Sequence, residues 1–245
     1  MFDPKKLLDD LLGSQVPGTQ GTVRDKASGA VKMAKDNPLA AGALAAVLLG
    51  TGTGRKMTGT AVKMGGLAAI AGLAYKAYQN YQAGKSPQDI NAPEQVAREP
   101  ELLPPPSDNG FHPQQAPQGE AEFSLTIVRA MIAAAKADGH IDDEERQKIA
   151  ERLGLLGMGS EAEQFLIKEL EAPVDVDALV AAAKTEEQKI ELYTASRLAI
   201  DSDTRAERGY LDLLAGRLQL PDALVDHVDA TVSTAKAAVP ANSPW

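Results

Sequence analysis

From about Glu120 to the end of the chain, apolar residues recur with the 3.6-residue period of an α-helix. No segment of this region alternates apolar and polar residues as a strand would. Capping-box spacings, and prolines that a helix interior excludes, mark where helices begin and end. The pattern predicts an all-α bundle of about seven helices over residues 121–245. We expect these helices to begin near Glu120, Asp142, Ser160, Asp175, Thr185, Thr204 and Pro221.

Two uncharged runs rich in Ala, Gly and Leu dominate the front of the chain. The first covers the 18 residues 37–54 and, as a helix, would span about 27 Å, close to the roughly 30 Å core of a bilayer. The second, 64–75, has 12 residues and reaches only about 18 Å. We therefore predict a Gly/Ala-rich, membrane-associating helical region over residues 37–85, with a soluble Gly/Ala-rich helical hairpin or a partly ordered segment as the alternatives. Gly50 and Gly54 have the spacing at which helix backbones approach closely in lipid, which indicates self-association.

The segments that flank this region have different compositions. Residues 1–36 form a basic segment that opens with a short amphipathic helix, expected to lie on a bilayer or on a partner. Residues 86–120 hold 8 of the 15 prolines and predict a flexible linker. The apolar face of the N-terminal helix is formed by Leu7, Leu8, Leu11 and Leu12. Aromatic residues of the kind found at membrane interfaces follow the second run, at Tyr75, Tyr78 and Tyr81.

Charge divides the chain in the same way. Residues 1–85 carry 11 Lys and Arg against 5 Asp and Glu, whereas the whole chain has a net charge of −9. A basic front half favours an anionic membrane as partner, and the acidic back half would repel nucleic acid. Cysteine is absent, which excludes disulfides, thiolate metal sites and a cysteine nucleophile.

Two acidic turns are the candidate functional sites of the bundle. They lie one helix hairpin apart, and each precedes a helix that ends in a similar sequence, which suggests an internal duplication. Two interpretations of their carboxylates stay open: capping of the following helix, or a divalent cation, calcium or magnesium, shared between the turns. The candidate metal ligands are Asp138, Asp142 and Glu145 in the first turn and Asp201, Asp203 and Glu207 in the second.

The first turn matches only half of a calcium-binding loop. Asp138, Asp142 and Glu145 have the spacing of its second half, but the upstream ligand positions fall on Ala134 and Lys136. Neither residue supplies a carboxylate, and the ammonium of Lys136 would repel a cation. We expect such a site to bind weakly unless the second turn contributes ligands.

The chain resembles the TerB-like tellurite-resistance superfamily in the motif Ala137-Asp138-Gly139-x-Ile141-x-x-x-Glu145 and in the second acidic turn after it. With the apolar front, the Pro-rich linker and the segment from Leu198-Ala199-Ile200-Asp201 to Glu207-Arg208-x-Tyr210-Leu211, it resembles YebE-like inner-membrane proteins of Gram-negative bacteria. The resemblance implies an all-helical TerB-type domain, membrane association, no established enzymatic activity and divalent-metal binding by the acidic turns. Ile200, which stands where the first copy has Asp138, departs from a symmetric site.

These observations favour a non-enzymatic, membrane-associated helical module that acts in envelope or tellurite stress through a protein partner and responds to a divalent metal. We expect it at the bacterial inner membrane with the helical domain on the cytoplasmic side, although the basic residues favour neither orientation. The alternative is a metal-dependent hydrolase, for which the sequence offers no base or nucleophile. His227, between acidic neighbours, is expected on an exposed helix face.

Overall fold

A computed structural model describes residues 3–11, 66–87, 104–137 and 160–237. All regular elements in these ranges are helical, which confirms the predicted all-α class. The helices are α1 (Pro4–Leu11), α6 (Gly66–Gln82), α9 (Glu120–Ala135), α11 (Ser160–Glu171), α12 (Val176–Ala182), α13 (Glu186–Ala199), α14 (Arg205–Leu218) and α15 (Asp222–Ala237), with a short 3-10 turn, η2 (Pro113–Gln115).

The helix starts follow the capping signals in the sequence. Asp175, Thr185 and Thr204 are the N-caps of α12, α13 and α14, and each side chain accepts a hydrogen bond from a backbone N–H in the first turn. Helices α9 and α11 begin at Glu120 and Ser160, and α15 begins directly after Pro221. These predicted starts are confirmed. The helix predicted from Asp142 lies outside the described residues.

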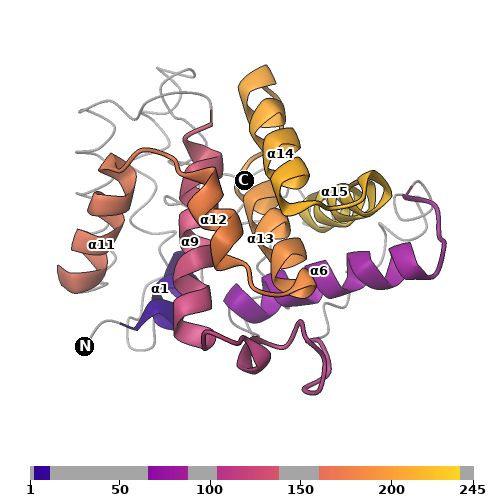
Figure 1. The fold of residues 1–245 in the computed structure, drawn as a ribbon, viewed down its shortest axis with the longest axis horizontal. Helices are drawn as coiled ribbons and strands as arrows, with labels where there is room; N and C mark the ends of the chain where they lie inside the picture. The colour runs from indigo at the N-terminus through magenta and orange to yellow at the C-terminus, as the bar shows by residue number, and fades with distance from the viewer. Residues whose placement is uncertain (1–2, 12–65, 88–103, 138–159, 238–245) are drawn as a thin grey trace, which may run out of the picture.

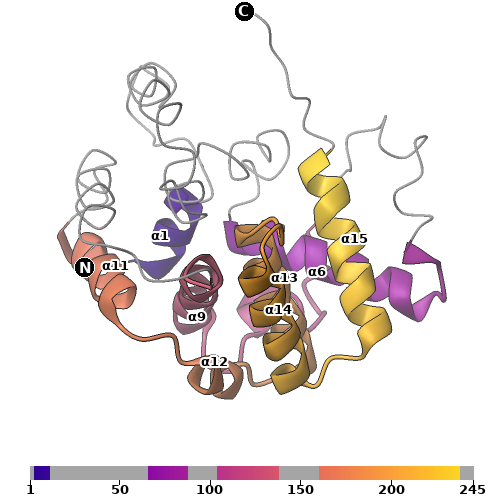
Figure 2. The ribbon, with the colours of Figure 1, turned by 90° about the horizontal axis from the view of Figure 1, so that it is seen from above.

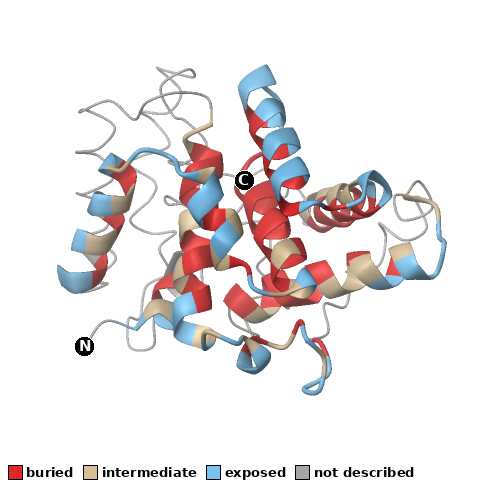
Figure 3. Cartoon of the chain, in the orientation of Figure 1, coloured by how far each residue is buried: buried red, intermediate tan, exposed pale blue. Residues whose placement is uncertain are grey.

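Helix α13 forms the centre of the bundle. It contacts α9, α6, α14 and α15, and α6 lies across the bundle against α13 and α15 (Figures 1 and 2). In Figure 3 the surface of α13 is almost entirely buried, whereas α11 and α14 show an exposed outer side. Among its buried apolar residues are Ile190, Leu192, Tyr193, Ala195 and Leu198.

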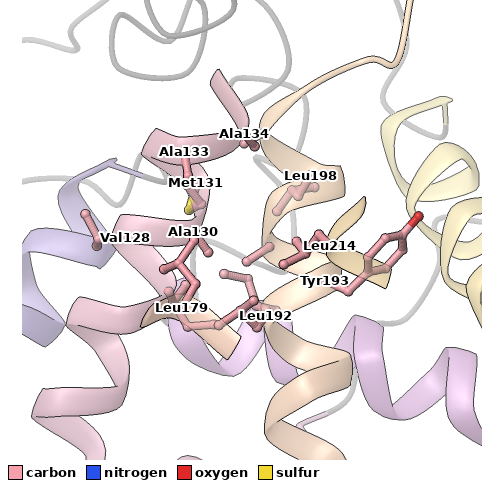
Figure 4. Packing of buried hydrophobic residues seen from close by; sticks show 14 of the residues in the cluster. Val128, Ala130, Met131, Ala133, Ala134, Leu179, Leu192, Tyr193, Leu198 and Leu214 are labelled. Atoms are coloured by element: carbon pink, nitrogen blue, oxygen red, sulfur yellow. The ribbon is translucent and has the colours of Figure 1, made fainter. Parts of the chain in front are cut away.

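Small side chains on α9 allow this close packing. Ala130, Ala133 and Ala134 are buried, and Figure 4 shows the apolar side chains that gather around them from α9, α12 and α13. The backbone carbonyl of Ala130 accepts a hydrogen bond from Ser196 Oγ of α13 and another from the Tyr210 hydroxyl of α14, both at 3.4 Å. The short alanine side chains therefore let polar side chains of two helices reach the backbone of a third.

Two elements of the front region belong to the same core. Leu7 and Leu8 of α1 are 2% and 0% exposed, and Leu67, Ile70 and Leu73 of α6 are equally enclosed. The second uncharged run, from Gly66 onward, thus packs against protein. Residues 37–54 lie outside the described residues. In the described ranges no helix is both long and apolar enough to cross a bilayer.

The described end of the Pro-rich segment, residues 104–119, also packs against the bundle. Phe111 is 1% exposed, and its ring lies 5.7 Å from that of Tyr75 and 5.5 Å from that of Tyr78. The Asn109 side chain accepts a hydrogen bond from the Phe111 backbone N–H, which holds the loop in place. Gln118 Nε2 of the same segment donates to the Ala182 carbonyl oxygen at 3.2 Å. Residues 104–119 are thus attached to the bundle at more than one point, whereas residues 88–103 lie outside the described residues.

Replacing Phe111 with alanine tests this anchor. We expect Phe111→Ala to lower the free energy of unfolding of the full chain by about 3–5 kcal/mol, because it empties a buried aromatic site. Urea denaturation followed by far-ultraviolet circular dichroism measures the change. Gln114→Ala, at an exposed position of the same loop, is the control and should stay within about 0.5 kcal/mol of wild type. A similarly small effect of Phe111→Ala would mean that Phe111 does not anchor the segment.

Candidate functional site

The second acidic turn connects α13 to α14 and is closed by a capping box. Thr204 Oγ1 accepts a hydrogen bond from the Glu207 backbone N–H at 3.1 Å, and Glu207 Oε2 accepts one from the Thr204 backbone N–H at 2.9 Å. Glu207 is only 6% exposed. The predicted capping role of this pair is confirmed.

A lysine from the last helix occupies the other side of the turn. Lys236 Nζ donates to the carbonyl oxygens of Ile200, at 2.7 Å, and Arg197, at 3.2 Å, and it lies 2.9 Å from Asp201 Oδ1. Arg197 Nη1 also donates to the Ile200 carbonyl, at 2.8 Å. Two cations thus satisfy the C-terminal carbonyls of α13, where the helix dipole is negative. Burial lowers the pKa of Lys236, and the hydrogen bond to Asp201 opposes that shift.

The middle of the turn is held by Arg208. Its Nη1 donates to the carbonyl oxygens of Ser202 and Asp203, both at 2.9 Å. Ser202 has the left-handed backbone conformation, with φ of 63°, which L-residues adopt at a cost. The carbonyl oxygens of Ile200, Ser202 and Asp203 are therefore already bonded to cationic side chains of the protein.

The three described candidate ligands thus lie in one turn but face different surroundings. Asp201 is paired with Lys236, Glu207 caps α14, and the Asp203 side chain is exposed. Within the described ranges, no group of three or more His, Asp or Glu side chains is arranged to share a metal ion. Asp138, Asp142 and Glu145 lie outside the described residues, so a site shared by the two turns stays a prediction.

Lys136, which the sequence placed beside the first turn, binds the end of another helix. Its ammonium donates to the Leu170 carbonyl oxygen at 2.8 Å and also to that of Ala172. These carbonyls lie at the C-terminus of α11. Burial lowers the pKa of Lys136, and Glu169 opposes this shift. Lys136 therefore satisfies carbonyl oxygens at the C-terminus of α11, as Lys236 does at the C-terminus of α13.

A polar cluster joins α13 to α15 on the other side of the turn. The Tyr193 hydroxyl donates to Asp229 Oδ1 at 3.1 Å, Arg197 Nε lies 3.4 Å from the same oxygen, and Arg197 Nη2 is 3.3 Å from Ser233 Oγ. Burial raises the pKa of Asp229, and the Arg197 guanidinium counteracts it. Burial also raises the pKa of Tyr193, which keeps its hydroxyl protonated as a donor.

Two further ionisable side chains, those of His227 and Glu191, are buried. His227 is 3% exposed, its ring centroid lies 6.1 Å from that of Tyr81, and its Nδ1 lacks a hydrogen-bond partner in the described structure. The prediction that His227 sits on an exposed face is therefore wrong. Glu191 of α13 is 2% exposed, and its Oε1 is likewise unpartnered. Burial, and secondly the charge of Glu187, raise the pKa of Glu191 well above its ordinary value.

The sequence analysis missed the buried polar contacts of α13 and α15 for a common reason. Arg197, Asp229 and Lys236 find their partners on other helices, so no local spacing announces them. The one available signal is periodicity: His227 follows Leu224 by three residues, on the side of α15 that also buries Val228.

A family model described as a protein of unknown function, DUF533, matches residues 34–232. The chain belongs to this family. The match runs through α6 and the later helices alike, which agrees with their shared core. The chain is also 30% identical over 113 residues to a protein of Yersinia enterocolitica described as an uncharacterised protein in the ampR 5′ region, covering 46% of this chain and 81% of the relative. No solved structure matches.

Substitutions at Glu207 separate capping from a role that needs its charge. Glu207→Ala should lower the free energy of unfolding by about 1 kcal/mol, because the Thr204 backbone N–H loses its acceptor. Glu207→Gln keeps an acceptor and should stay within about 0.5 kcal/mol of wild type. Urea denaturation of the full chain measures both. If glutamine costs as much as alanine, the carboxylate charge has a role beyond the cap.

Glu191 should make stability depend on pH. Because its folded-state pKa lies above the ordinary value of 4.5, the folded chain holds a proton that the unfolded chain has released. The free energy of unfolding should therefore fall as pH rises above about 4.5, by up to about 1.4 kcal/mol per pH unit, until the folded pKa is passed. Glu191→Gln should remove this contribution.

Urea denaturation of the full chain at pH 5, 6, 7 and 8 measures the slope. The exposed Glu186 on the same helix supplies the control, since Glu186→Gln should leave the slope of wild type unchanged. Equal slopes for Glu191→Gln and wild type would show that Glu191 is ionised in the folded protein.

Proposed function

We propose that this chain is a membrane-attached, non-enzymatic helical module of the TerB-like kind, which binds a protein partner at the bacterial inner membrane. The observation that carries the proposal is the burial of α6. Leu67, Ile70 and Leu73 of the second uncharged run pack inside the bundle, so that run already has a protein environment. The first run, residues 37–54, is longer, with 18 residues against 12, and equally free of charge, and it lies outside the described residues, so it is the remaining candidate for contact with lipid.

Charge supports attachment through the first run. Residues 1–85 carry an excess of basic residues, whereas the rest of the chain is acidic. Basic side chains next to an apolar segment gain about 1 kcal/mol each near an anionic lipid surface. The helical module would then be held at the membrane with its acidic surface in water.

The contacts of the second turn support a binding module over a catalyst. Lys236, Arg197 and Arg208 bond its carbonyl oxygens, and Glu207 caps a helix. Each of these groups has a structural task already. In this proposal a divalent cation acts as a signal at the first turn, through Asp138, Asp142 and Glu145.

Flotation of the purified full chain with liposomes tests the attachment. We expect the wild type to float with vesicles of phosphatidylcholine and phosphatidylglycerol and to stay bound in high salt. Leu44→Lys combined with Leu48→Lys should reduce the bound fraction at least tenfold, because each lysine costs about 2.5–3.5 kcal/mol in a bilayer core.

The matched control adds the same charges to the bundle. Leu213 and Val174 are exposed apolar residues, at 48% and 41% exposure, so Leu213→Lys with Val174→Lys should float like wild type. Recovery of the wild-type chain in the lipid-free fraction would contradict the proposal.

A further inference from the structure

Residues 104–119, which we call the strap, are held on the bundle in the manner of a bound peptide. In the described structure, the backbone-to-backbone hydrogen bonds of residues 104–118 all stay inside the strap, where they form a series of turns from Pro106 to Gly119. The strap is therefore folded by its own turns, and side chains attach it to the helices.

Three apolar side chains carry this attachment. Pro105, Phe111 and Pro113 are buried, whereas most of the other strap residues are exposed. The Phe111 ring is tilted by 56° against the Tyr75 ring and by 49° against the Tyr78 ring, at separations typical of attractive aromatic pairs. A buried aromatic side chain among exposed residues is the arrangement of a hot spot in a binding interface.

The surface beneath the strap is formed by α6 and α9. The short turn η2, which begins at Pro113, contacts both helices. Tyr75 and Tyr78 are three residues apart and therefore lie on one face of α6. Five of the 16 strap residues are prolines, which have no backbone N–H to leave unpaired. A Pro-rich segment against an aromatic surface is a recurring mode of peptide recognition.

Two further contacts join the strap to α13. At Gly110 a Cβ would lie only 2.6 Å from Cδ of Glu187, so the strap backbone passes directly over that side chain. At the end of the strap, Gln118 and Gln188 exchange amide hydrogen bonds of 3.1 and 3.3 Å. These contacts, like that of Phe111, do not depend on a backbone ladder, so another segment with similar side chains can replace them.

We propose that the α6 surface around Tyr75 and Tyr78 is the docking surface for the protein partner, and that the strap occupies it as an internal competitor. The partner segment carries an aromatic residue followed two positions later by proline, as Phe111 and Pro113 are placed in the strap. This inference rests on the partner binding in the proposed function and adds its surface and its chemistry. The partner binds only when the strap is released, so the surface stays covered in the free chain.

The probe is a fluorescent synthetic peptide with the sequence of residues 104–119, titrated into the purified full chain and followed by anisotropy. In the wild type the attached strap competes at an effective concentration on the order of millimolar. Phe111→Ala removes the main anchor of the strap, so the peptide should bind this variant at least about tenfold more tightly than wild type. A peptide with alanine in place of its phenylalanine should not bind.

A second variant releases the strap without emptying a buried site. Gly110→Asp places a carboxylate against Glu187 and should also bind the peptide more tightly than wild type. Circular dichroism reports whether each variant is folded, and bound peptide should raise its melting temperature. If a folded variant of either kind does not bind the peptide at about 1 mM, the proposal is wrong.

A disulfide tests where the peptide binds. Glu187 Cγ lies 3.0 Å from the position of a Cβ on residue 110, so Gly110→Cys and Glu187→Cys are close enough to pair, and the chain has no cysteine of its own. When these two substitutions are added to Phe111→Ala, oxidation should fix the strap in place and prevent peptide binding, and reduction should restore it. Equal binding by the oxidised and reduced chains would overturn the proposal, because the peptide would then occupy another surface.

The failure of this inference and that of the membrane attachment are distinguishable. If the chain does not float with liposomes but the released variants bind the peptide and the disulfide excludes it, the attachment is wrong and the docking surface stands. If the chain floats but the peptide does not bind, the attachment stands and the docking surface is wrong.

Discussion

The burial of helix α13 on nearly all sides is the constraint on which the rest of the structure depends. Of its 14 residues, 11 are buried. Burying an unpaired donor or charge costs free energy, so most polar side chains of such a helix have partners within the protein, although Glu191 Oε1 has none in the described structure. The partners come from three directions: Gln118 reaches Gln188, the Ala130 carbonyl accepts from Ser196, and Asp229 pairs with Arg197. These contacts fix how α9 and α15 sit on α13.

The helices were predictable because their signals are local. Thr185 and Thr204 cap the helices that were expected to begin there, and α9 and α11 begin at Glu120 and Ser160 as the apolar period indicates. What periodicity cannot show is that a helix is enclosed on all sides. Glu191 and Arg197 interrupt the apolar pattern of α13, and in sequence they resemble a solvated face. Arg197 contacts Asp229 and Ser233 of α15, which joins α13 from a distant part of the chain, as α6 does.

The front of the chain shows the same limit in another form. Three tyrosines after an apolar run are typical of a membrane interface, and nothing in the run itself distinguishes lipid from protein as the neighbour. In the structure the neighbours of Tyr75 and Tyr78 are a phenylalanine from the Pro-rich segment, and Tyr81 meets His227. The amphipathic face of α1 likewise packs on α6 and α9. An apolar face predicts that a helix is covered, and the covering surface must be identified from the fold.

The ligand-binding capacity of the second acidic turn depends on the lysine that lies beside it. Asp201 was identifiable as a candidate ligand, but Lys236 comes 35 residues later and no spacing links the two. Its ammonium is surrounded by the Ile200 carbonyl, the Arg197 carbonyl and the Asp201 carboxylate, oxygen atoms of the kind that calcium prefers. A divalent cation at this turn would have to displace that ammonium into water or bind beside it against its repulsion. The Lys236 ammonium thus provides a positive charge at the second turn, and it also satisfies carbonyl oxygens at the C-terminus of α13.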